Sequence, residues 1–182
     1  MRRTIYTLVA MPLLLAGVLT ASSAYAHFVP APCDFITGGG FVFDDSGGRV
    51  NFGAHGGCKN GAFWGHVNVL DHGYSPPAHL RSTSITGYLM DPDFPNARDI
   101  CGQGVVDGGA GSFTVTFRVR MEDNGEPGAG RDRFGLRLSN GADLTTRTLV
   151  GGNIQLHKPN PSTTGPNPAP TEAEMCGTLP TP

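Results

Sequence analysis

Apolar and polar residues alternate with a period of two through most of this 182-residue chain. The clearest run is SFTVTFRV (112–119), in which two Phe and two Val residues alternate with Ser, Thr and Arg. Side chains on a β-strand point alternately to the two faces of a sheet, so such a run is typical of a strand with one buried face. No window shows a sustained apolar pattern at helical spacing. The pattern therefore predicts an all-β protein.

Further runs of this kind divide the chain into short strands. RFGLRL (133–138) and GGNIQLH (151–157) alternate clearly, and shorter or less regular runs lie at 35–43, 49–54, 62–70 and 80–90. The 27 Gly and 15 Pro residues are scattered along the chain and mark turns. About seven or eight strands joined by Gly-rich turns predict an antiparallel β-sandwich of jelly-roll type, with a small β-barrel as the alternative.

The two ends of the chain differ from the alternating middle. Arg2 and Arg3, the apolar run LVAMPLLLAGVL and the small residues of AYA (24–26) have the order of a secretory signal peptide. We therefore expect residues 1–26 to be removed, which gives a secreted protein, extracellular or periplasmic, that begins at residue 27. The apolar run is shorter than the roughly twenty residues of a spanning helix, so we expect no membrane insertion after cleavage. Residues 27–158 are predicted to form one domain, and the Pro-rich residues 159–182 form a tail.

The charge balance and the cysteines narrow the class of protein. Removal of the two leader arginines from 13 basic and 15 acidic residues leaves 11 and 15, a net charge of −4, which argues against a nucleic-acid partner. Four cysteines follow the cleavage site without a CxxC pair, as expected for two disulfides in an exported protein. Three pairings are possible. We favour Cys33 with Cys176, which would tie the two ends together, and Cys58 with Cys101.

Four blocks of the sequence resemble a known family in their order. They are CDFITGGGF (33–41), GHVNVLDHG followed by HLRSTSITGY (65–88), DNGEPGAGRDRFGLRLSNG (123–141) and GGNIQLHKP (151–159). This order is similar to that of the post-COAP domain, a secreted bacterial module named for following a choice-of-anchor domain. The resemblance implies an extracellular β-rich module without an assigned activity, and it transfers no catalytic residue. Because no anchoring domain precedes the blocks here, we expect the module to act as a free secreted protein.

The segment MEDNGEPGAGRDRF (121–134) is too long for a simple hairpin turn and is rich in acidic residues. Its oxygen atoms suit calcium, which takes about six to eight oxygen ligands. We select Asp123, Asn124, Glu126 and Asp132 as candidate calcium ligands, although their spacing is not that of an EF-hand. Two alternatives stay open: a solvated turn in which neighbouring arginines pair the acids, and a pair of catalytic carboxylates.

A second candidate site lies in FWGHVNVLDHGYSPPAH (63–79), which holds three histidines. In an extended strand, Trp64, His66 and Asn68 would share one face. We predict a ligand-binding site of Trp64, His66, Asn68, Asp71 and His72, where a glycan would stack on an aromatic ring and hydrogen-bond to the polar side chains. Zinc or copper held by the imidazoles, and ordinary structural roles for these residues, are the alternatives.

Cleavage of the leader would expose His27, which then offers an α-amine and an imidazole together. With a second histidine (His66, His72, His79 or His157), it could form the copper site of a lytic polysaccharide monooxygenase, so a copper-dependent secreted enzyme is the alternative function. No GxSxG elbow, HExxH pair or phosphate loop occurs. The sequence thus favours a non-catalytic binding or structural module of the bacterial cell surface or extracellular space. Its expected partner is an extracellular glycan or protein, and its candidate cofactor is calcium.

Overall fold

The computed structural model describes residues 26–182, and nine strands and one short helix form its regular structure. The elements are β1 (Phe35–Phe43), β2 (Arg49–Lys59), β3 (Ala62–Asp71), β4 (Ala78–Asp91), β5 (Phe94–Gly108), β6 (Gly111–Glu122), β7 (Arg133–Leu138), β8 (Asp143–Thr148), β9 (Gly151–His157) and α1 (Glu172–Cys176). The predicted signal peptide falls almost wholly on residues 1–25, which lie outside the described part of the chain.

All nine strands belong to one antiparallel sheet with the order β8-β7-β6-β5-β4-β3-β2-β1-β9. Strands β1 to β8 form a meander in which each strand pairs with the next, and β9 returns to pair with β1. The predicted all-β, antiparallel and disulfide-linked fold is therefore confirmed. The sheet has nine strands, because two strands were not expected from the sequence.

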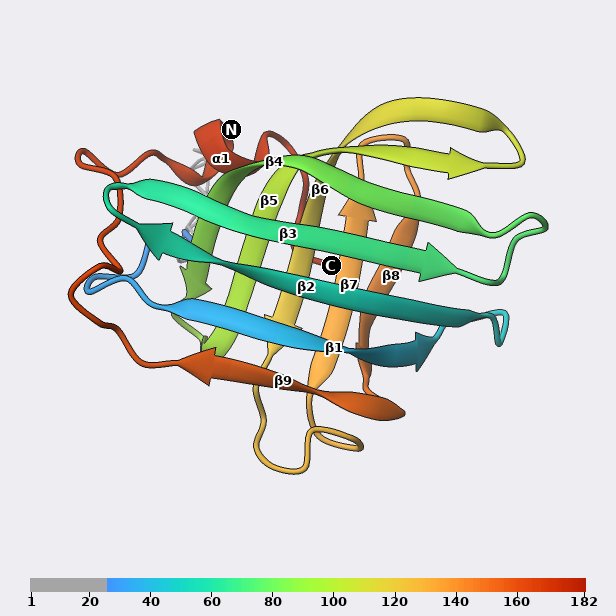
Figure 1. Cartoon of the computed structure of the whole chain (residues 1–182), viewed down its shortest axis with the longest axis horizontal. Helices are drawn as coiled ribbons and strands as arrows, with labels where there is room; N and C mark the ends of the chain where they lie inside the picture. The colour runs from blue at the N-terminus through green and yellow to red at the C-terminus, as the bar shows by residue number, and fades with distance from the viewer. Residues whose placement is uncertain (1–25) are drawn as a thin grey trace, which may run out of the picture.

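The sheet curls so that its two halves face each other. Figure 1 shows β9, β1, β2 and β3 in a front layer, with β7 and β8 behind them. The long strands β4, β5 and β6, of 14, 15 and 12 residues, curve from one layer to the other. Register shifts between β4 and β5 at Ser82/Ser84 and Ile85/Gly87 allow this bend, because a bulge increases local twist. One continuous half-barrel sheet thus makes the expected two layers.

The hydrophobic core fills the space between the layers. Ile36, Val67 and Phe117 are fully buried there, each on the inward side of its strand. Phe52 of β2 stacks on Phe134 of β7 with 3.9 Å between ring centroids, so the contact joins the front layer to the back layer. Full burial of each such side chain contributes about 1.5–3 kcal/mol, and this packing holds the curled sheet closed.

Two strands, β5 and β8, did not follow the expected pattern. β5 carries Arg98 and Asp99 in succession, and both are buried, so neither face of the strand is purely apolar. β8 has the sequence DLTTRT, in which Leu144 is the one large apolar side chain. Alternation alone does not mark either segment as a strand, because their burial depends on distant parts of the chain.

The preferred cysteine pairing is wrong, since the structure joins Cys33 to Cys58 and Cys101 to Cys176. The register of the β1–β2 hairpin pairs Phe35 with Gly57, which brings the flanking residues Cys33 and Cys58 together. Cys101 lies on the outward side of β5, in a small cluster with Leu89, Met175 and Cys176. Residues 159–182 are therefore tied to the outside of the sheet through α1. Within residues 26–182, no helix has the length and apolar character needed to cross a membrane.

Candidate functional site

The outward surface of β9, β1, β2 and β3 collects rings and polar side chains from strands that are distant in sequence. Thr37 of β1 lies opposite His55 of β2, which lies opposite His66 of β3. In the next row, Phe35 is paired with His157 of β9 on one side and, through Gly57, with Trp64 on the other. We call this surface the open face and define it by Phe35, Thr37, His55, Trp64, His66, Asn68 and His157.

The rings of the open face contact one another. Phe35 and His157 are stacked with 4.3 Å between ring centroids and 8° between planes. Trp64 lies 6.0 Å from Phe35 and 5.4 Å from His55, again between centroids. The Nε1 atom of Trp64 is buried and has no hydrogen-bond partner in the described chain, so Trp64 presents its ring to solvent and not its N–H. The rings thus form one continuous apolar edge.

Hydrogen bonds fix the imidazoles and amide beside these rings. The Ser82 hydroxyl accepts the Val67 N–H at 2.9 Å and lies 2.9 Å from Nδ1 of His66, so its own proton can be donated to that nitrogen. Oδ1 of Asn68 lies 2.8 Å from Nε2 of His79, which leaves the amide N–H₂ of Asn68 free to donate outward. The positions of these donors are therefore set before any ligand binds.

A positive charge on His55 is disfavoured by its surroundings. Burial lowers the pKa of His55, and the neighbouring charge of His66 lowers it further. The two ring centroids are 6.3 Å apart, a distance at which two imidazolium ions would repel each other. Two positive charges are therefore disfavoured at the centre of the open face.

A bare strip of backbone crosses the open face. Gly39 of β1 pairs with Gly53 of β2, which pairs with Asn68 of β3. A Cβ atom added to Gly53 would meet nothing within 4 Å, and one added to Gly39 would touch only backbone, at 3.4 Å or more. Because neither glycine has a side chain, this strip is flat, and a planar ligand could lie directly on the backbone.

The structure divides the residues predicted for the ligand-binding site. Trp64, His66 and Asn68 share the open face, as expected from alternation. Asp71 points to the opposite side of the sheet, where it lines a cavity, and His72 lies in the turn after β3. No group of three or more His, Cys, Asp or Glu side chains that could hold a metal occurs in residues 26–182. The imidazoles therefore do not converge on a zinc or copper site.

Sequence reasoning left four residues of the open face out of the ligand-binding site, namely Phe35, Thr37, His55 and His157. One of them carried a usable signal. Asn60 and Gly61 form a two-residue turn with φ values of 52° and 82°, as the dipeptide Asn-Gly favours in a β-hairpin. Counting back from that turn in both directions places His55 opposite His66. Phe35 and His157 gave no such signal, because β1 and β9 are separated by more than a hundred residues.

The acidic segment after β6 caps the free edge of β9. Asp132 is fully buried, its Oδ1 accepts the Asn124 N–H at 2.8 Å, and its Oδ2 accepts the Ile154 N–H at 2.7 Å. Oδ2 of Asp123 accepts the Leu156 N–H at 2.8 Å. The N–H groups of Ile154 and Leu156 bond to these carboxylates and not to β1, so the two carboxylates replace a missing neighbouring strand.

The remaining candidate calcium ligands are also engaged by protein donors. Oε1 of Glu126 accepts from Nδ2 of Asn153 at 2.9 Å, and Oδ1 of Asn124 accepts from Nδ2 of Asn96 at 2.6 Å. Calcium needs several oxygen atoms that converge on one point. Here the oxygens diverge toward separate N–H groups, so the arrangement does not fit calcium. It fits an ordered turn that ties β6 and β7 to β9.

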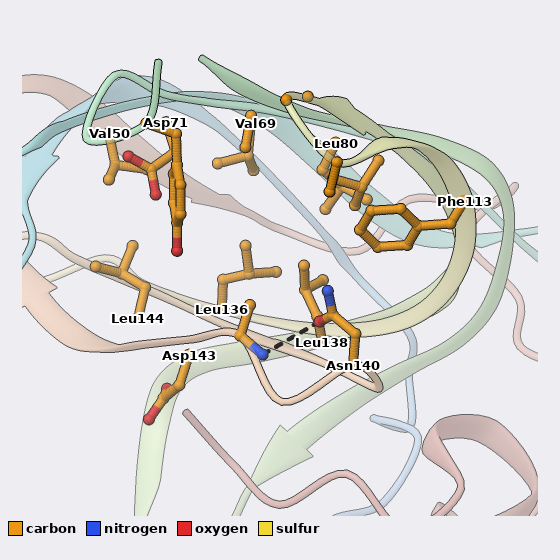
Figure 2. Close-up of a pocket in the computed structure, with 17 residues that line it drawn as sticks. Val50, Val69, Asp71, Leu80, Phe113, Leu136, Leu138, Asn140, Asp143 and Leu144 are labelled. Carbon is orange, nitrogen blue, oxygen red and sulfur yellow. Dashed lines mark hydrogen bonds between the residues drawn. The ribbon is translucent and has the colours of Figure 1, made fainter. Parts of the chain in front are cut away.

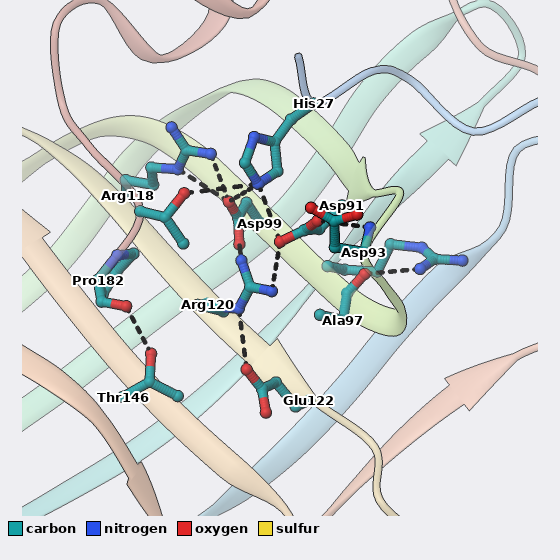
Figure 3. Close-up of polar contacts among 12 residues, drawn as sticks. His27, Asp91, Asp93, Ala97, Asp99, Arg118, Arg120, Glu122, Thr146 and Pro182 are labelled. Atoms are coloured by element: carbon teal, nitrogen blue, oxygen red, sulfur yellow. Dashed lines mark hydrogen bonds and ion pairs between the residues drawn. The ribbon is translucent and has the colours of Figure 1, made fainter. Parts of the chain in front are cut away.

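His27 lies among acidic and basic side chains on the other half of the sheet (Figure 3). Its Nδ1 is 3.2 Å from Oε1 of Glu172, and its Nε2 is 3.3 Å from Oδ2 of Asp91. Its backbone N–H donates to Oε2 of Glu172 at 3.0 Å. No second histidine joins these contacts in the described residues. The geometry therefore gives no support to a copper site at His27.

Comparison with known proteins identifies no relative of this chain. No family model, no curated protein and no solved structure matches this chain.

Proposed function

We propose that this protein is a secreted, non-catalytic binding module that holds a neutral glycan on the open face. The observation that carries the proposal is the bare strip at Gly39 and Gly53, bordered by stacked rings and by side chains with free hydrogen-bonding groups. Sugars offer flat C–H faces for stacking and many hydroxyls for hydrogen bonds. A flat strip with rings along one edge suits such a ligand.

The charge of the open face favours a neutral ligand over an ionic one. None of its seven residues is acidic, Lys or Arg, and burial and the charge of His66 lower the pKa of His55. Recognition of a phosphate or a carboxylate relies on Arg or Lys, and Arg81, which lies opposite Asn68, is already paired with Asp107, so an anionic ligand would have to compete with that carboxylate. A sugar needs only the amide of Asn68 and the imidazoles as donors and acceptors.

Secretion and the sequence resemblance support the same proposal. The leader has the order of a signal peptide, and the two disulfides are typical of proteins that fold in an oxidising compartment. The four blocks that resemble the post-COAP domain would place the module outside a bacterial cell. A module in this location would meet polysaccharides of the cell wall or matrix, which are therefore its expected ligands.

Binding can be tested by mixing the secreted protein with insoluble cellulose, chitin, xylan or peptidoglycan and measuring what stays in solution. We expect at least one polymer to deplete the wild-type protein. Gly53→Val adds a side chain whose Cβ meets nothing within 4 Å, so the fold should be kept while the strip is blocked. We expect affinity to fall at least tenfold, which corresponds to about 1.4 kcal/mol.

The matched control is Thr114→Val, at an exposed outward position of β6 away from the open face. It should bind like wild type. If none of the four polymers depletes the protein, or if Gly53→Val binds as well as Thr114→Val does, the glycan proposal is wrong.

A further inference from the structure

A second concave site lies at one end of the curled sheet, between its two layers. This cavity has a volume of about 220 Å³. Figure 2 shows side chains of the front layer, such as Val69, facing Leu136 and Leu144 of the back layer across an open space. Leu80, Phe113 and Leu138 complete the apolar wall. The cavity belongs to the inward side of the sheet and is separate from the open face.

Small residues leave the mouth of this cavity open. Gly108, Gly109 and Ala110 at the β5–β6 turn, Ala78 at the start of β4 and Ala142 before β8 line it. Larger side chains at these positions would close the end of the sheet, as they do in a sealed core. The open mouth leaves the apolar lining accessible to water, which is unfavourable. A bound apolar group would remove this surface from water.

Two acids, Asp71 and Asp143, belong to the cavity lining, and Asp71 is the one without an Arg partner in the described part of the chain. Its Oδ1 accepts the Gly73 N–H at 2.8 Å, which leaves Oδ2 to meet a ligand. Burial raises the pKa of Asp71, and the nearby charge of Asp44 adds to this effect. A Cβ added to Gly73 would be 2.9 Å from Oδ2 of Asp44 and 3.1 Å from Oδ1 of Asp71, so the two carboxylates are close neighbours.

Within residues 26–182, neither Asp71 nor Asp44 forms an ion pair with Lys or Arg, although the charge of His72 acts on Asp71. The other acid of the lining, Asp143, pairs with Arg137. Asp44 remains ionised, since a hydrogen bond from Ser46 and backbone N–H groups hold its pKa low. The mouth therefore carries negative charge that a positively charged ligand would neutralise.

We propose that the cavity binds a small primary amine with an aromatic or branched aliphatic body, which lies among the apolar side chains while the ammonium group meets Asp71. The volume sets the size of the body, because an apolar cavity of about 150 Å³ holds one benzene ring. A cavity of 220 Å³ has room for a ring with a two-carbon arm. This inference rests on the inward side of the sheet and does not depend on glycan binding.

The test uses 2-phenylethylamine and 2-phenylethanol, which differ only in the ammonium and hydroxyl group. Calorimetric or NMR titration of the secreted protein should show that the amine binds about tenfold more tightly, as expected for a hydrogen bond between two charged groups. Asp71→Asn keeps the acceptor for Gly73 but removes the negative charge, so the two compounds should then bind equally. Ala142→Phe should plug the mouth and abolish binding of both, whereas Ala62→Phe, an exposed position on β3, should not.

Each outcome bears on the proposal. Saturable binding with the expected order of affinities, lost in Ala142→Phe, would support it. No saturable binding of either compound up to its solubility limit would overturn it, and so would equal affinity of amine and alcohol in the wild type. Gly53→Val should leave amine binding unchanged, so failure of the glycan proposal and failure of this one can be told apart.

Discussion

The outward surfaces of the two halves of the sheet differ in whether other parts of the chain cover them. Over β9, β1, β2 and β3 the outward surface is uncovered, and it carries the aromatic and imidazole rings and the Asn68 amide of the open face. Over β4, β5 and β6 the chain ends cover it: Phe28 pairs with Met90, and α1 is tied to β5 through Cys176. There Asp99 and Arg118 are only 1% and 2% exposed. The alternation of β6 looks half-buried in sequence, yet one stretch of it is buried on both faces.

The covered half is held by buried ion pairs, whereas none of the seven residues that define the open face is acidic, Lys or Arg. Arg118 contacts Asp99 and Glu172, while Arg120 contacts Asp91 and Glu122. Buried charges of this kind are stable only in well-paired sets, and Figure 3 shows how His27 completes one of them. A polar strand face is therefore not by itself a binding site. The polar outward faces of β5 and β6 hold the chain ends, whereas the outward surface of the open half stays accessible to a ligand.

Removal of one buried charge should therefore cost far more than removal of an exposed one. In Arg118→Met, Asp99 loses hydrogen bonds of 2.9 Å and 2.5 Å and stays buried, so we expect a loss of about 3 kcal/mol in the free energy of unfolding. Arg49→Met is the matched change on the open half, where Arg49 lies exposed over the Phe41 ring, and it should cost less than about 1 kcal/mol. Urea unfolding of both variants measures the difference. Equal losses would show that the covered half does not depend on its charges.

The free edge of β9 is the place where the open half does depend on a buried acid. Asp132→Asn replaces an oxygen that accepts a backbone N–H with an amide that cannot accept it, at a cost of about 2 kcal/mol. The loss should be the same in EGTA as in calcium buffer. Asp45→Asn, whose carboxylate is exposed and pairs with Arg147, should change little. A loss seen only in calcium buffer would instead restore the calcium hypothesis for this segment.

The sequence predicted the local features of the fold well and the long-range ones poorly. Alternation identified β6, β7 and β9, because each has one clearly apolar face. It failed for β5, whose outward residues are buried by chain ends about seventy residues away in either direction. It also gave no basis for the disulfide pairing, because Cys101 and Cys176 meet only after residues 159–182 have packed against the sheet.

For the candidate sites too, the sequence predicted local groupings of residues but not contacts between distant parts of the chain. Trp64, His66 and Asn68 could be grouped because they lie on one strand, and Asp71 was wrongly joined to them because its odd-numbered position faces inward. The acidic segment predicted calcium ligands, with a solvated turn or a pair of catalytic carboxylates as the alternatives. Its partners are backbone N–H groups of β9, which no residue type reveals.

The smallest expected effect is a pH dependence confined to the covered half. Burial alone would raise the pKa of Glu172, but the hydrogen bond and charge of Arg118, together with His27, outweigh it and lower the pKa. A carboxylate with a lowered folded-state pKa stabilises the fold above its unfolded pKa, and this stabilisation is lost as pH falls through the folded value. Asp99 has the opposite sign, because burial raises its pKa, so its protonation on acidification relieves a cost.

Glu172→Gln isolates the first of these contributions. The variant should be less stable than wild type at about pH 7, and the difference should shrink as the pH falls through the lowered folded-state pKa of Glu172. Thermal unfolding midpoints across this range give the comparison. The effect is modest because the Glu172 side chain is 27% exposed and partly screened by solvent. A difference that stays constant with pH would mean that Glu172 holds α1 by its shape and hydrogen bonds, and that its charge contributes nothing to closing the covered half.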